Sequence, residues 1–155
     1  MPREVMHRQA ADNLYLHKDF HGALSVGLEY LHSRFGEQAV RDYIRQFAQS
    51  FYSPLREAMA ARGLAALKEH LERIYAVEGG QVQLESSGES LTLRVAACPA
   101  VTHIKSHGYC LARLFAETTR TLYPAICEGT PYAATIVSYD AATGAAEVRF
   151  QRRPA

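Results

Sequence analysis

The chain has 155 residues, of which 48% are hydrophobic and 21% are charged, as is typical of one globular domain with its own core. Its net charge of +1 gives no reason to expect nucleic acid or an anionic membrane as a partner. No apolar run reaches membrane-spanning length, no signal-peptide core is present, and three scattered cysteines form no disulfide framework. We expect a single domain over residues 1–155, located in a reducing cytoplasm.

Apolar residues recur at steps of three and four throughout the first half of the chain, which predicts helices. Glycines and one proline divide this half into segments, because glycine commonly ends a helix and proline interrupts one. The expected helices are residues 20–35 before Gly36, residues 40–51 before Pro54 with a brief continuation to Gly63, and residues 64–74 closed by Gly79 and Gly80.

The second half changes to alternation at period two, which predicts strands with one buried face. Residues 82–95 form a hairpin around "SSGE", Leu111 begins a helix that reaches Cys127, and "YAATIVSYD" and "AEVRFQRR" form a second hairpin. The predicted fold class is α+β. A helical N-terminal half is followed by two β-hairpins with an intervening helix, and helices cover one face of an antiparallel sheet.

Cys98 and Pro99 stand where the alternating strand "LTLRVAACP" ends. Proline restrains the preceding residue to extended backbone and favours a helix start, so Cys98 is predicted at a helix N-cap. Free backbone N–H groups and the helix dipole favour a thiolate there, which makes Cys98 a candidate catalytic nucleophile. The alternative is a buried structural cysteine.

Two histidine pairs, His17/His21 and His103/His107, have the i, i+4 spacing that places both imidazoles on one helix face. That spacing suits a metal, but neither pair has the glutamate of the HExxH motif, and we predict neither a metal site nor a particular cofactor. His103 lies too far along its helix from Cys98 for a firm hydrogen bond. The predicted catalytic base is therefore His17 or His21, from across the fold.

A third group must orient the imidazole, and Asp19, Glu117 and Glu128 are candidates for this role. We select Glu117 as a catalytic residue, with an ordinary exposed helix glutamate as the alternative.

Cys127 lies in the irregular segment "YPAICEGTPY" and is a candidate ligand-binding residue. No dinucleotide, P-loop, serine-hydrolase or paired CxxC motif is present.

Four segments together, "YLHKDFHGAL", "YLHSRFGEQAVRDYIRQFA", "LRVAACPAVTHIKSHG" and "AICEGTPYAATIVSYDAATG", resemble the L-2-amino-thiazoline-4-carboxylic acid hydrolase-like family. The resemblance covers most of the chain. It implies a hydrolase that opens a cyclic amidine by cleaving a carbon–nitrogen bond and gives an N-carbamoyl amino acid.

In that reaction the Cys98 thiolate, or water activated by a histidine, attacks the amidine carbon, and Glu117 or a histidinium protonates the leaving atom. Arg113, Arg120 or the helix that begins at Pro99 is expected to bind the substrate carboxylate, and His103 is a further expected ligand-binding residue.

Two other classes of function stay open. One is a non-catalytic small-molecule or cofactor-binding module with a sensory role, similar to vinyl-reductase-like regulatory domains. The other is an interaction protein, because the apolar faces at Leu24/Leu28/Leu31 and Ile44/Phe47/Phe51 permit a homodimer. Colour or stoichiometric metal in a purified sample would favour the binding module.

Overall fold

The computed structural model describes residues 19–155 and has the predicted α+β architecture. Its elements in chain order are α1 (Phe20–Phe35), α2 (Glu37–Phe51), α3 (Ser53–Arg62), α4 (Leu64–Glu78), β1 (Val82–Ser87), β2 (Ser90–Val95), α5 (Pro99–Ser106), α6 (Glu117–Arg120), α7 (Leu122–Cys127), β3 (Tyr132–Tyr139) and β4 (Ala146–Arg152).

The helices of the first half end where the sequence predicts. Gly36, Gly63 and Gly79 follow α1, α3 and α4, and each has a positive φ that other residues rarely adopt. Pro54 stands in the first turn of α3, where its missing N–H leaves no hydrogen bond unmade. The predicted interruption is therefore the boundary between α2 and α3.

The helix predicted from Leu111 to Cys127 is shorter than expected, because residues 107–116 form turns and irregular backbone and α6 begins at Glu117. Ser25 of α1 explains the difference. Its hydroxyl donates to the Cys110 carbonyl at 2.9 Å and accepts from the Ala112 N–H at 2.8 Å. Tertiary hydrogen bonds thus replace helical ones, while the apolar side chains of this segment pack against α1 and α5.

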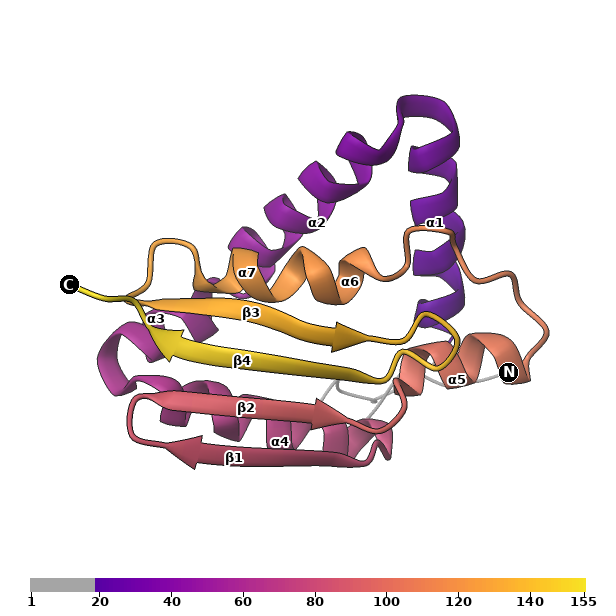
Figure 1. The fold of residues 1–155 in the computed structure, drawn as a ribbon. Coiled ribbons are helices and arrows are strands. Elements are labelled where there is room, and N and C mark those ends of the chain that lie inside the picture. Colours follow the sequence, from indigo (N-terminus) through magenta and orange to yellow (C-terminus); the bar gives the residue numbers. More distant parts are fainter. Residues whose placement is uncertain (1–18) are drawn as a thin grey trace, which may run out of the picture.

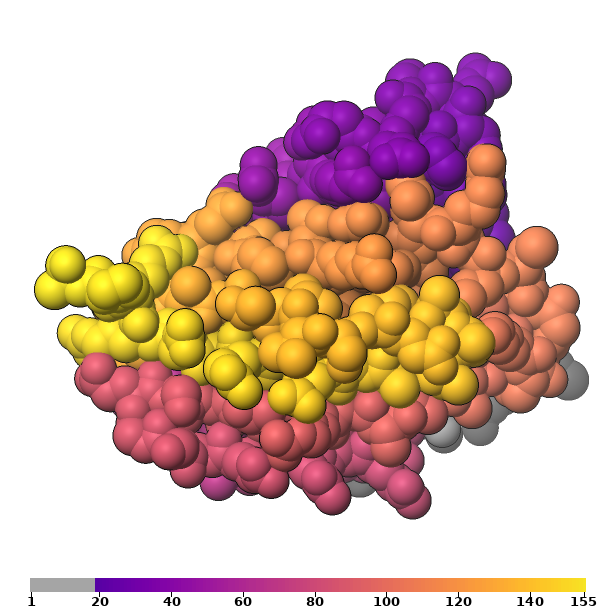
Figure 2. All heavy atoms as spheres, viewed as in Figure 1, coloured from indigo at the N-terminus to yellow at the C-terminus, as the bar shows by residue number. Residues whose placement is uncertain are grey.

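The four strands form one antiparallel sheet in the order β1-β2-β4-β3. Leu91 lies opposite Phe150 and Leu93 opposite Val148 in the β2–β4 register, and all four side chains are buried. The helices lie behind this face, and the opposite face is open to solvent (Figure 1, Figure 2). The predicted one-sided coverage of the sheet is confirmed.

Two clusters of buried side chains hold the helices in place. One joins α3, α4 and α7 to the sheet, with Tyr123 edge-on to Phe150 at 5.5 Å between ring centroids. The other joins α1 and α2 to α5, and includes Leu28 and Ile44. These two residues of the expected dimer faces therefore pack inside the molecule, whereas Phe51 stays exposed. Within residues 19–155, no helix combines the length and apolar character needed to cross a membrane.

Candidate functional site

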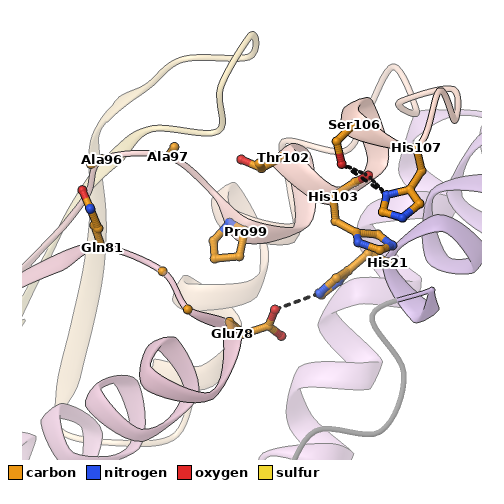
Figure 3. A pocket seen from close by; sticks show the side chains of 12 residues that line it. His21, Glu78, Gln81, Ala96, Ala97, Pro99, Thr102, His103, Ser106 and His107 are labelled. Atoms are coloured by element: carbon orange, nitrogen blue, oxygen red, sulfur yellow. Dashed lines mark hydrogen bonds and ion pairs between the residues drawn. The ribbon is translucent and has the colours of Figure 1, made fainter.

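A cleft of about 570 Å³ lies between α1, the end of α4 and α5 (Figure 3). One wall is the turn that joins α4 to β1, and the facing wall is α5, which presents its histidines. The lining residues are His21, Glu78, Gly79, Gly80, Gln81, Ala96, Ala97, Pro99, Thr102, His103, Ser106 and His107. We call this space the histidine cleft.

Each of its three imidazoles has one ring nitrogen next to an acceptor. His21 Nε2 lies 3.1 Å from Glu78 Oε2, and His103 Nε2 lies 3.3 Å from Asp19 Oδ1. His107 Nδ1 lies 2.9 Å from the backbone carbonyl of His103. An acceptor fixes the proton on the nitrogen that faces it, so in the neutral ring the lone pair is on the other nitrogen.

The histidines reach this arrangement from two helices. His103 of α5 and His107, the C-cap of that helix, stand one turn apart with ring centroids 4.0 Å apart, and the ring of His21 of α1 lies 6.2 Å from that of His103. Gly22 allows α1 to approach so closely, because a Cβ there would lie 3.0 Å from the ring of Tyr109. The backbone at Gly22 thus helps to bring His21 opposite α5.

The two carboxylates that pair with histidines of the cleft differ in their exposure to solvent. The side chains of His21 and Glu78 are each 15% exposed, whereas that of Asp19 is 80% exposed. Water screens an exposed ion pair and weakens it. The His21–Glu78 pair is therefore the better candidate for an imidazole that a carboxylate holds in one orientation.

Cys98 is the N-cap of α5, with extended backbone, and Pro99 is the first residue of the helix, as predicted. The helix N–H groups act on the thiol as expected, but they are not the largest effect on its pKa. Burial raises the pKa of the Cys98 thiol and outweighs the opposing effect of the Val101 and Ala100 N–H groups; the charge of Glu78 raises it further. Cys98 does not line the histidine cleft.

The predicted site residues Glu117, Arg113 and Arg120 have other partners and lie outside the lining of the histidine cleft. Glu117 is 7% exposed; its carboxylate lies 3.5 Å from Arg41 Nε and accepts from the Thr121 hydroxyl at 2.5 Å. It is therefore neither the exposed glutamate that we considered nor a group in the cleft.

Arg113 pairs with Glu29 at 2.7 Å, and the Arg120 guanidinium lies over the Tyr139 ring, 5.4 Å from its centroid. Cys127 is fully buried, and burial raises the pKa of its thiol to about 11. It too is absent from the lining of the cleft. Of the predicted site residues, only His21 and His103 line it together, and His17 lies outside the described residues.

Glu78 is the carboxylate of the histidine cleft that the sequence interpretation missed. It is 57 residues from His21 in the sequence, so no local spacing connects the two. The available signal is its place as the last residue of α4, directly before the Gly79–Gly80 turn. In the described part of the chain, no three histidine, cysteine or acidic side chains are grouped so as to hold a metal ion.

Comparison of the chain with models of known protein families and with curated proteins finds no match. The fold and the site therefore define an α+β protein with a histidine-lined cleft, and its function must be inferred from the chemistry of that cleft.

Proposed function

We propose that the histidine cleft is the active site of a hydrolase that opens a cyclic amidine. The observation that carries this proposal is the half-buried pair of His21 and Glu78, with the His103 ring next to His21 in a cleft open to solvent. A carboxylate that holds an imidazole in one orientation and stabilises its protonated form is a common arrangement in acid–base catalysis.

In the proposed reaction, the oxygen of water bonds to the amidine carbon while His21 takes the proton that water gives up. Glu78 stabilises the resulting imidazolium. The amidine reacts with its ring nitrogen protonated, so the tetrahedral adduct is neutral. The adduct then collapses: a carbonyl forms as the bond from the former amidine carbon to the leaving ring atom breaks, His21 returns its proton to that atom, and the hydroxyl proton of the adduct passes to solvent. His107 lines the same cleft, and its Nε2 lone pair can accept a hydrogen bond from a protonated amidine.

The leaving atom depends on the ring. An N-carbamoyl product keeps the ring nitrogen bonded to the carbamoyl carbon. In a 2-aminothiazoline the bond that breaks is therefore carbon–sulfur, and not the carbon–nitrogen bond expected from the resemblance, and the leaving atom becomes a thiol. In a ring whose amidine carbon is bonded only to nitrogen atoms, the leaving atom is a nitrogen and becomes an amine. Water replaces Cys98 as the proposed nucleophile, because the raised pKa of this thiol leaves little thiolate at neutral pH.

The test is thiol release from 2-amino-2-thiazoline-4-carboxylate, followed with a thiol-reactive chromophore. We expect many turnovers per wild-type molecule, and a loss of roughly 100-fold or more in kcat in His21→Gln, the size expected for a lost general base. His32→Gln is the matched control, because His32 lies on α1 as His21 does but does not line the cleft, and it should keep wild-type activity.

Cys98→Ala separates the two nucleophiles. Activity within a few-fold of wild type supports water attack, whereas abolished turnover in a folded Cys98→Ala protein overturns it. If the wild-type protein binds this amidine but never turns it over, the hydrolase proposal fails and the non-catalytic binding module is favoured.

A further inference from the structure

A second groove, of about 530 Å³, lies where the end of α2 meets α3 and α4, and it shares no lining residue with the histidine cleft. Its apolar lining comes from Phe51, Tyr52, Pro54, Leu55, Ala58 and Ala66. Its polar lining comes from Arg62, Glu69, His70 and Arg73. We call this space the aromatic groove.

The aromatic wall of this groove is ordered by ring contacts yet open to solvent. Phe51 is 65% exposed and stacks on Phe47, with centroids 5.0 Å apart and planes 11° from parallel. Tyr52 stands edge-on to Phe51 at 5.0 Å and edge-on to His70 at 5.5 Å. A large exposed aromatic ring held in this way offers a surface for an apolar ligand.

The polar lining offers hydrogen-bond donors. Glu69, its only carboxylate, pairs with Arg62 at 2.6 Å. Arg73 donates to His70 Nδ1 at 3.4 Å, and no carboxylate of residues 19–155 lies within ion-pair distance of it.

His70 adds a further donor. Its Nδ1 accepts from the Arg73 guanidinium, so its proton is on Nε2. Burial, together with the charge of Arg73, lowers the pKa of His70 to about 4, which keeps the ring neutral at physiological pH. A ligand can thus meet the Arg73 guanidinium and the His70 N–H here, while the carboxylate of Glu69 is paired with Arg62.

We propose that the aromatic groove binds a small organic anion, a carboxylate with an aromatic or aliphatic body. The body packs against Phe51 and Tyr52, and the carboxylate binds Arg73. The volume lies within the range of small-molecule sites, and an apolar lining with a few placed polar groups is typical of them. The unpaired charge of Arg73 sets the sign of the ligand, since a guanidinium binds a carboxylate at two oxygens.

The test compares 2-naphthoate with 2-naphthalenemethanol, which has the same ring system and no charge. Titration calorimetry gives the affinities, and amide NMR shifts give the location. We expect 2-naphthoate to bind at least tenfold more tightly, with shifts centred on residues 51–73. Arg73→Gln should weaken naphthoate about tenfold and leave the alcohol unchanged, because it removes a charge-assisted contact.

Phe51→Ser should weaken both ligands, since it removes the apolar wall. Arg149→Gln is the matched control, an exposed arginine on the open sheet face, and should change neither affinity. Equal affinity for the two ligands overturns the proposal, as does unchanged naphthoate binding in Arg73→Gln. If the amide shifts of residues 51–73 change with protein concentration and not with added ligand, this face binds a second copy of the chain. That result would also overturn the proposal.

Discussion

The three thiols occupy different environments at the residue scale, and their reactivity should follow. Cys110 is exposed, Cys98 is half-buried and Cys127 is buried. Burial raises the pKa of both Cys98 and Cys127, so thiolate is scarce at these two sites. Under native conditions at pH 7.5, iodoacetamide should label Cys110 first and Cys127 last, as measured by peptide mass spectrometry. Labelling of Cys98 as fast as that of Cys110 would restore it as a reactive cysteine.

His70 should link stability to pH. Its folded-state pKa is lowered to about 4 from 6.5, so between these pH values the unfolded chain binds a proton that the folded chain does not. Stability from this group is therefore present above pH 6.5 and is lost as pH falls towards 4. Wild type should lose more unfolding free energy between pH 7 and pH 5 than His70→Gln does in urea titrations. Equal losses would show that the native imidazole titrates normally.

The β3–β4 turn positions α5 at the element scale, and with it two of the cleft histidines. The Thr143 carbonyl accepts from the Cys98 N–H at 3.0 Å, and Lys105 in the last turn of α5 donates to the Ala142 carbonyl. Asp140 orders the turn by accepting from the Ala142 N–H at 2.8 Å and the Thr143 hydroxyl at 2.9 Å. These contacts hold both ends of the helix against the sheet.

Gly144→Ala tests how closely the β3–β4 turn packs against Cys98. A Cβ at Gly144 would lie 2.4 Å from Cys98 Cβ, and the backbone has φ +69. We expect a loss of about 2–4 kcal/mol in unfolding free energy, from backbone strain and the clash together. Gly88→Ala is the matched control: it has φ +56 but open space around it, so it should lose only the strain part, about 1 kcal/mol. Equal losses in urea titrations would mean that the turn does not press on Cys98.

Local sequence patterns predicted most helix boundaries, because the glycines and prolines that mark a boundary lie at the boundary itself. Pro99 marks the start of α5, and Gly36 and Gly79 follow α1 and α4. The segment around Leu111 also has apolar residues at helical spacing. Its backbone groups at Cys110 and Ala112 nevertheless hydrogen-bond to the Ser25 hydroxyl of α1. No local pattern contains that partner, so the missing helix could not be foreseen from the sequence.

The one-sided sheet is the main feature at the scale of the whole molecule, and alternation in the strands was enough to predict it. Leu93 is buried between the sheet and the helices, whereas Thr92 points to the open face. Leu93→Ala should lower the unfolding free energy by about 2–5 kcal/mol and Thr92→Ala by less than about 1 kcal/mol. Similar losses in urea titrations would mean that both faces of the sheet are covered.

The site was less predictable than the fold, because it joins residues far apart in the sequence. The spacing of His103 and His107 placed both on one face of α5, but nothing local links His21 to Glu78. Glu117, predicted as a catalytic residue, follows the apolar residues Leu114, Phe115 and Ala116 in the sequence. In the structure it is buried, with Arg41 and Thr121 as its partners. A polar residue in an apolar pattern therefore indicates burial without saying whether it has a catalytic or a structural partner.

The proposed role of the His21–Glu78 pair in catalysis is tested by the kcat of Glu78→Gln for thiol release from 2-amino-2-thiazoline-4-carboxylate. The amide keeps the shape of Glu78 but cannot stabilise a protonated His21, so kcat should fall by roughly 100-fold or more while KM changes little. A wild-type kcat in Glu78→Gln, with turnover abolished in Cys98→Ala, would contradict the account and return catalysis to the cysteine.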